Sequence, residues 1–95
     1  MYTSVRRYEG CTNAKELAQK VSEGFVPLVS QVPGFISYLV VDSGGGVVSS
    51  ISTFLNQAAA EESNKRAADW VRQTIAHLLP NPPHITAGEV TVYKK

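Results

Sequence analysis

The feature that most constrains this chain is the segment "VPGFISYLVVDSGGGVVSSISTF", residues 32–54, which reads as two strands joined by glycines. Along a strand, successive side chains point to opposite faces of the sheet. Both strands carry large apolar side chains at odd and at even positions. A sheet covered by helices on one face alone needs only one of these sets to be apolar. The pattern therefore predicts that something covers the second face as well.

The remaining strands and turns follow from local composition. The two central strands are predicted at Gly34–Asp42 and Val47–Leu55, and the "DSGGG" between them tolerates the positive φ angles of a tight antiparallel connection. Runs rich in β-forming residues at Tyr2–Glu9 and Ile85–Tyr93 predict a first and a last strand.

Two helices are predicted between the strands. The first begins at Asn13, or alternatively at Thr12, with Glu16 placed to complete a capping box, and Pro27 is expected to kink it or to split off its last turn. The second begins at Asn56 and ends at "LLPNPP". Each carries an apolar stripe at helical spacing: Leu17, Val21, Phe25, Leu28 and Val32 in the first, and Ala60, Ala67, Val71, Ile75 and Leu78 in the second.

This order of elements, strand–helix–strand–strand–helix–strand, predicts an α+β fold of the ferredoxin-like βαββαβ type. In that sandwich a four-stranded antiparallel sheet carries two helices on one face. Residues 1–95 are the right length for one domain with one core, and no shift in composition divides them.

The strand patterns also suggest which face the helices cover. We assign the helices to the more uniformly apolar set, which comprises Val5, Phe35, Leu39, Val41, Ile51, Val90 and Val92. The other set mixes apolar and polar groups: Arg6, Tyr8, Ile36, Tyr38, Val40, Val48, Ser50, Ser52, Phe54, Glu89 and Thr91. That mixture is too apolar for bare solvent, so we expect it to face a second copy in a homodimer, around a partly polar cavity between the two sheets.

Composition excludes several function classes. The net charge of +1, with scattered basic residues, gives no basis for nucleic-acid binding, and no apolar run approaches the roughly 20 residues needed to cross a bilayer. The start has no apolar signal-peptide region, so a cytoplasmic protein is expected. One cysteine, Cys11, allows no internal disulfide, and no His, Asp or Glu cluster has metal-ligand spacing. The pattern predicts neither a metal nor another cofactor.

The chain resembles the antibiotic biosynthesis monooxygenase-like group of dimeric α+β barrel proteins. The resemblance covers nearly the whole chain and rests on the element order, on "VPGFISY" entering the second strand and on "SISTFLNQAAAEES". With "GFVPLVSQVPGF" and "LLPNPP", it is similar to small bacterial members of the superfamily. The resemblance implies a homodimer and chemistry on small molecules. Active members oxidise polycyclic phenols without metal or flavin, degrade haem, bind small ligands, or carry out isomerase- and dehalogenase-like reactions.

The candidate ligand pocket comprises Arg6, Tyr8, Tyr38, Ser50, Ser52, Phe54 and Glu89. Tyrosine hydroxyls can donate to a developing oxyanion, and Arg6 could hold an anionic substrate group. The alternative is that Arg6 and Glu89 form an ion pair across the sheet or between subunits, while the serines fill space.

Weaker candidates lie on the second helix. Haem-degrading relatives use a Trp, a helix His and an Asn, which invites comparison with Asn64, Trp70 and His77. The alternative places Trp70 at the edge of the core, His77 exposed near the helix end, and Asn64 in a hydrogen bond to the elements beneath it.

Three hypotheses follow. The first is a homodimeric domain that binds a small, largely apolar aromatic or phenolic molecule, with cofactor-free oxygenation as its candidate activity. The alternatives are a structural module whose sheet face serves only to dimerise, and a haem-binding or haem-degrading protein.

Overall fold

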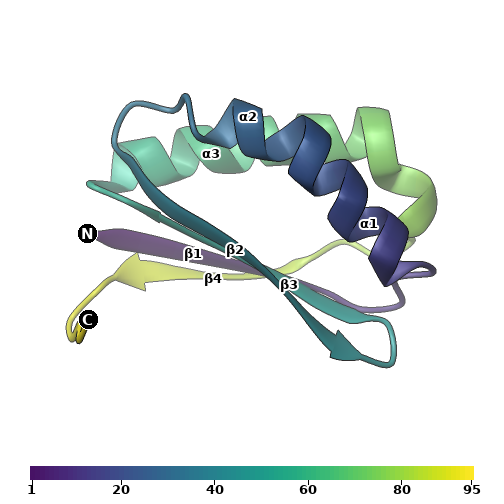
Figure 1. The fold of residues 1–95 in the computed structure, drawn as a ribbon. Coiled ribbons are helices and arrows are strands. Elements are labelled where there is room, and N and C mark those ends of the chain that lie inside the picture. Colours follow the sequence, from purple (N-terminus) through teal and green to yellow (C-terminus); the bar gives the residue numbers. More distant parts are fainter.

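The computed structural model describes all residues, 1–95, and shows one four-stranded antiparallel sheet with helices on one of its faces (Figure 1). The sheet consists of β1 (Tyr2–Tyr8), β2 (Phe35–Gly44), β3 (Val47–Phe54) and β4 (His84–Glu89), in the order β2-β3-β1-β4. This confirms the predicted ferredoxin-like α+β fold. The helical segments are α1 (Ala14–Lys20), η1 (Val21–Phe25), α2 (Val26–Val29), α3 (Gln57–Trp70), η2 (Val71–Ile75) and η3 (Ala76–Leu78).

Both helical runs begin at the predicted caps. The Asn13 side-chain oxygen accepts a hydrogen bond from the Glu16 amide at 3.1 Å, and the Asn56 oxygen accepts one from the Ala59 amide at 2.9 Å. Each satisfies an amide that has no partner within the first turn of its helix. The predicted return bond from the Glu16 carboxylate is replaced by a contact with His77, 3.2 Å away.

Pro27 does not break the first helical run. The turn before it, η1, is a π-helix, in which the Val26 amide donates to the Val21 carbonyl. Proline has no amide hydrogen and its ring crowds the carbonyl four residues earlier, so the widened turn accommodates it and the last turn of the run is the separate short helix α2. The second run has a similar π segment, η2, followed by the tighter 3₁₀ turn η3.

The predicted assignment of the two sheet faces is wrong. The helices cover the mixed face, where Ser4 and Phe54 are 0% exposed and Arg6 is 7% exposed. The aliphatic face is open, with Leu39 56% and Val41 43% exposed. Alternation along the strands identifies two sets of side chains, but it does not say which set lies under the helices.

Two local features shift side chains from their predicted places. Because of a bulge between Phe35 and Ser37, the Phe35 ring lies on the helix-covered face. There it packs edge-on against the Phe54 ring, and the two ring centres are 6.0 Å apart. The last strand ends at Glu89, so Val90 and Val92 lie beyond it, and the Val90 amide donates to the Met1 carbonyl.

The core lies between the helices and the mixed face of the sheet. Its fully buried side chains include Phe54, Ile75, Val29 and Ser4. Residues of both predicted helical stripes, such as Leu17 and Ala60, are buried there as well. None of the helices is both long and apolar enough to cross a membrane.

Candidate functional site

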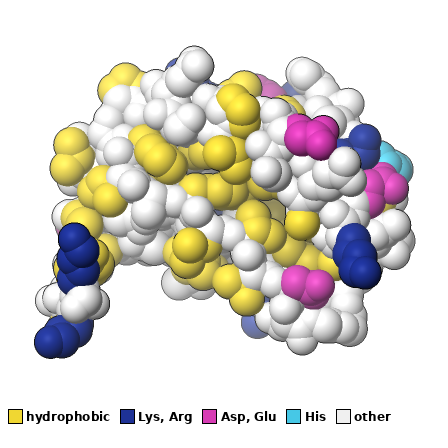
Figure 2. Space-filling view, viewed as in Figure 1, with side chains coloured by type: hydrophobic (Ala, Val, Ile, Leu, Met, Phe, Trp, Pro, Cys, Tyr) yellow, Lys and Arg dark blue, Asp and Glu magenta, His cyan; other side chains and the backbone are white.

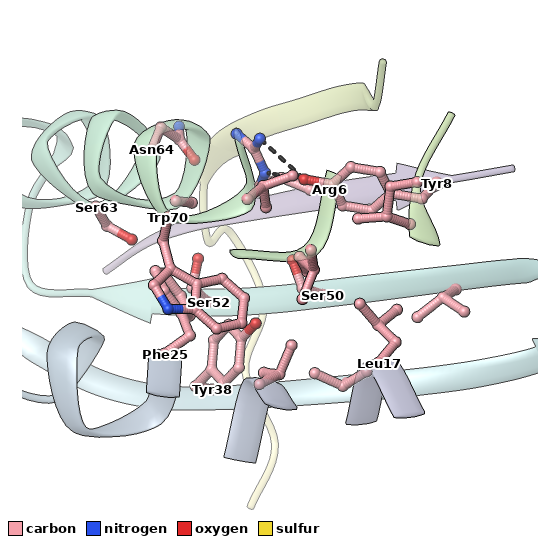
Figure 3. A pocket seen from close by; sticks show the side chains of 17 residues that line it. Arg6, Tyr8, Leu17, Phe25, Tyr38, Ser50, Ser52, Ser63, Asn64 and Trp70 are labelled. Carbon is pink, nitrogen blue, oxygen red and sulfur yellow. Dashed lines mark hydrogen bonds between the residues drawn. The ribbon is translucent and has the colours of Figure 1, made fainter. Parts of the chain in front are cut away.

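A cavity lies within the chain, between the sheet and the two helical runs (Figure 3). The cavity has a volume of about 40 Å³. In the view of Figure 2, hydrophobic side chains gather in a band between the helices and the strands, around a hollow in the surface. The lining is mostly hydrophobic. Its apolar and aromatic members are Tyr8, Leu17, Val21, Phe25, Tyr38, Val40, Val48, Ala67, Trp70, Val71, Ile75 and Leu79, and the others are Arg6, Ser50, Ser52, Ser63 and Asn64.

An aromatic cluster forms one side of the cavity. The Phe25 ring of η1 lies 5.5 Å from the Tyr38 ring and 5.5 Å from the Trp70 ring, tilted to both by 59° and 45° respectively. Gly24 makes room for the indole, because a Cβ there would lie 2.9 Å from Trp70 Cζ2. Such tilted contacts are favourable arrangements for aromatic rings. This side presents flat apolar surfaces to a ligand.

Arg6 provides the only charged side chain in the lining. Its Nε and Nη2 groups donate to the Tyr8 hydroxyl at 3.2 and 3.0 Å, and its guanidinium lies 5.8 Å from the centre of the Tyr8 ring. The two residues are two apart on β1, so alternation places both on the helix-covered face. In Figure 3 they stand together at one side of the cavity, away from the aromatic cluster.

Tyr38 is a neutral phenol in this setting. Burial raises the pKa of Tyr38 to about 12, with a further increase from Tyr8, while Ser50 and Arg6 act in the opposite direction. A phenol whose pKa lies this high keeps its proton at neutral pH and can donate a hydrogen bond to an oxygen that carries negative charge.

Asn64 is anchored between the helix and the sheet. Its side-chain oxygen accepts a hydrogen bond from the buried Ser4 hydroxyl at 3.2 Å, and the Ser52 hydroxyl donates to the Ser4 carbonyl at 3.5 Å. The Asn64 amide nitrogen has no hydrogen-bond partner within the chain, although Asn64 lines the cavity. Its N–H groups are therefore free to donate to a bound molecule.

Most of the predicted pocket residues come together, but in a different place from the one expected. Arg6, Tyr8, Tyr38, Ser50 and Ser52 line the cavity. Because these five residues lie under the chain's own helices, the predicted placement of their cavity between the sheets of two copies is wrong.

The other two predicted pocket residues lie outside the lining. Phe54 is fully buried in the core, and Glu89 lies 3.8 Å from the N-terminal amine. The alternative, an Arg6–Glu89 ion pair across the sheet, does not form within the chain. Across the β1–β4 ladder, Arg6 is opposite Ile85 and Glu89 is opposite Tyr2.

The three weaker candidates are not assembled into one site. Asn64 and Trp70 line the cavity, whereas the His77 side chain is 60% exposed and lies 3.2 Å from the Glu16 carboxylate, outside it. His77 is therefore an exposed residue at the end of the helical run, as the alternative interpretation proposed. No three His, Cys, Asp or Glu side chains are grouped closely enough to hold a metal ion.

Sequence reasoning missed the helical part of the lining. Leu17, Val21 and Phe25 belong to the first apolar stripe, and a stripe of this kind is normally interpreted only as core. Ser63 and Ala67 carried a usable signal, because small side chains on the buried face of a helix leave space that large ones would fill.

Comparison with known proteins identifies the fold. No protein-family model and no curated protein sequence matches the chain. The solved structures that resemble it include NE2512, a protein of unknown function from Nitrosomonas europaea, at 19% identity and a TM-score of 0.78, covering 99% of this chain and 92% of the other. A monooxygenase from the gene ActVA-Orf6 of Streptomyces coelicolor, in complex with nanaomycin D, has 19% identity and a TM-score of 0.73, with coverages of 99% and 92%.

A third similar structure is a MhuD mutant with two manganese protoporphyrin IX molecules bound per active site. It has 12% identity and a TM-score of 0.74, and the match covers 100% of this chain and 99% of the other. At these identities the likeness concerns the fold and not the chemistry. The chain therefore has the ferredoxin-like fold that is also found in solved structures described as antibiotic biosynthesis monooxygenases.

Proposed function

We propose that this protein binds a small, largely apolar aromatic or phenolic molecule in the cavity between its helices and its sheet. The observation that carries the proposal is the composition of the cavity wall, where the aromatic cluster of Phe25, Tyr38 and Trp70 faces a few convergent polar groups. Apolar walls with a small number of polar groups are typical of ligand sites. Because the enclosed volume is small, a ring must also occupy the mouth or displace a lining side chain.

Cofactor-free oxygenation is the candidate activity. Support comes from the Tyr38 phenol and the Asn64 amide, two donors that line the same cavity and could stabilise a substrate anion while oxygen reacts. In the proposed reaction of an anthrone-type phenol, a ring CH₂ becomes a carbonyl. One atom of O₂ enters the product and the other leaves as water with the two hydrogens. The likeness to the ActVA-Orf6 monooxygenase is consistent with this chemistry.

The proposal includes a homodimer formed through the open face of the sheet. Val5 is opposite Ile51 and Ile51 is opposite Leu39, so an apolar row crosses three strands, and Val41 follows Leu39 on the same face. Leu39 and Val41 are exposed in the single chain. If a second copy packed the same face against this one across a two-fold axis, the apolar surface of both copies would be removed from water.

The binding proposal is tested by filling the cavity. Ala67→Val adds two carbons to the wall of the cavity, whereas Ala58→Val adds the same atoms at an exposed position of the same helix. Trp70 is the only tryptophan, so its fluorescence reports on the cavity during titration with phenols. We expect phenols to change the Trp70 emission of the wild type and of Ala58→Val. We expect them to bind Ala67→Val at least about fivefold more weakly, since overpacking costs about 1–3 kcal/mol.

Oxygen uptake is measured on the same proteins with an anthrone-type phenol, and Tyr38→Phe is added to the set. A rate for Tyr38→Phe equal to that of the wild type would remove the phenol from the mechanism. If no phenol changes the Trp70 signal of the wild type, the ligand proposal fails and the structural dimer module remains.

A further inference from the structure

We propose that the ligand carries a single negative charge, as a carboxylate does, and that Arg6 binds it where the inner cavity meets a groove on the surface. This inference rests on the proposed function and adds the chemical class of the ligand. It starts from the state of the Arg6 guanidinium, a buried cation without an anionic partner.

Arg6 is 93% buried by the chain, being 7% exposed, yet none of the ion pairs of the structure includes it. Both of its hydrogen bonds go to the hydroxyl of Tyr8. A buried charge is normally paired with an opposite charge, because the loss of its water shell is costly. Arg7, its neighbour on the other face of the sheet, has a carboxylate partner in Glu9 at 3.4 Å.

The unused part of the guanidinium borders open space. Nε and Nη2 donate to Tyr8, and Nη1 has no hydrogen-bond partner in the chain. Since no fully enclosed side-chain nitrogen or oxygen lacks a partner, Nη1 must reach a space that solvent or a ligand can occupy. Guanidinium N–H groups bind carboxylates strongly, through charge-assisted hydrogen bonds.

The space beside Arg6 belongs both to the inner cavity and to a groove on the surface. Arg6, Tyr8, Val71 and Leu79 line both the inner cavity and an open groove of about 270 Å³, whose other residues include Pro80 and Pro83. The groove contains a second cation, Arg72, but Asp69 already pairs with it at 2.6 Å. Arg6 is therefore the unpaired cation of both spaces. A ligand whose ring occupies the apolar cavity can place its carboxylate at Arg6, which lines both spaces.

The test uses two probes of nearly the same shape, salicylate and its neutral amide, salicylamide. Binding is followed by NMR at neutral pH through the indole N–H signal of Trp70, the single tryptophan. We expect both probes to shift this signal and salicylate to bind about tenfold more tightly, the effect of one charge-assisted contact. Arg6→Gln should abolish the preference, and Arg6→Lys should retain part of it because the charge remains.

Arg7→Gln is the matched control, since it removes the same charge from the adjacent residue on the open face. It should leave the preference for salicylate unchanged. Equal binding of the two probes to the wild type, or equal losses in Arg6→Gln and Arg7→Gln, would overturn the inference while leaving the proposed function intact. Absence of any Trp70 shift with either probe would instead count against the proposed function.

Discussion

Small and hydroxylated side chains occupy positions beneath the helices where aliphatic groups usually pack. Ser4, Ser52 and Ser63 are buried there, and Ala67 lies beside them. Serine and alanine fill less volume than leucine or isoleucine, so the layer between helices and sheet is not completely filled. The cavity follows from these residue choices.

Tyr38 gives this site a measurable pH dependence. Its pKa rises from the ordinary value of 10.0 to about 12 in the folded chain, so the folded state keeps the phenol proton after the unfolded chain has lost it. The stabilisation is complete below pH 10 and is lost as the pH rises to 12. Relative to Tyr38→Phe, the wild type should lose about 2–3 kcal/mol of unfolding free energy over this range, measured by urea denaturation.

The exposed Tyr93 provides the control, because Tyr93→Phe should follow the wild type through the same pH range. A parallel decline in the wild type and in Tyr38→Phe would show that the Tyr38 phenol ionises normally.

Single residues also show what could be predicted from the sequence. Tyr38, Ser50 and Ser52 were expected to line one pocket with Arg6, because alternation along neighbouring strands places them on one face. Alternation carries no information about which side the helices occupy, and hence the pocket was placed between two copies. Phe35 was assigned to the wrong face because a bulge adds one residue to β2 and so interrupts the alternation.

At the scale of elements, boundaries set by local chemistry were predictable. Helix starts depend on one side chain and one turn of backbone, and Asn13 and Asn56 both cap as expected. The end of the last strand was not predictable in this way, because "EVTVY" alternates like a strand while the ladder with β1 ends at Glu89. Whether a strand continues depends on a neighbouring strand that is distant in sequence.

The Asn56 cap can be tested through stability. Asn56→Ala removes the acceptor of the Ala59 amide, and we expect it to lower the unfolding free energy by about 1 kcal/mol. Gln73→Ala, at an exposed position in η2, should change it by less than about 0.5 kcal/mol. A loss no greater than that of Gln73→Ala would mean that water replaces the cap without cost.

For the whole molecule, the open aliphatic face is the feature that predicts association. Leu39→Glu places a charge on the exposed end of the apolar row, and we expect it to convert the proposed homodimer into a monomer in sedimentation velocity experiments. Val26→Glu makes the same exchange on α2, at an exposed position on the helical side, and should remain dimeric. A folded wild-type monomer at micromolar concentration would refute the pairing of sheets.

The incompletely filled layer has a consequence for how the fold responds to its surroundings. A molecule that settles there and cannot bind the unfolded chain adds its binding free energy to the stability of the protein, about 2.7 kcal/mol at a hundred times its dissociation constant. For a chain of 95 residues, each kilocalorie corresponds to about 4–8 °C in melting temperature. Heat resistance should therefore identify the natural occupant, since the compound that fits best is the one that delays melting most.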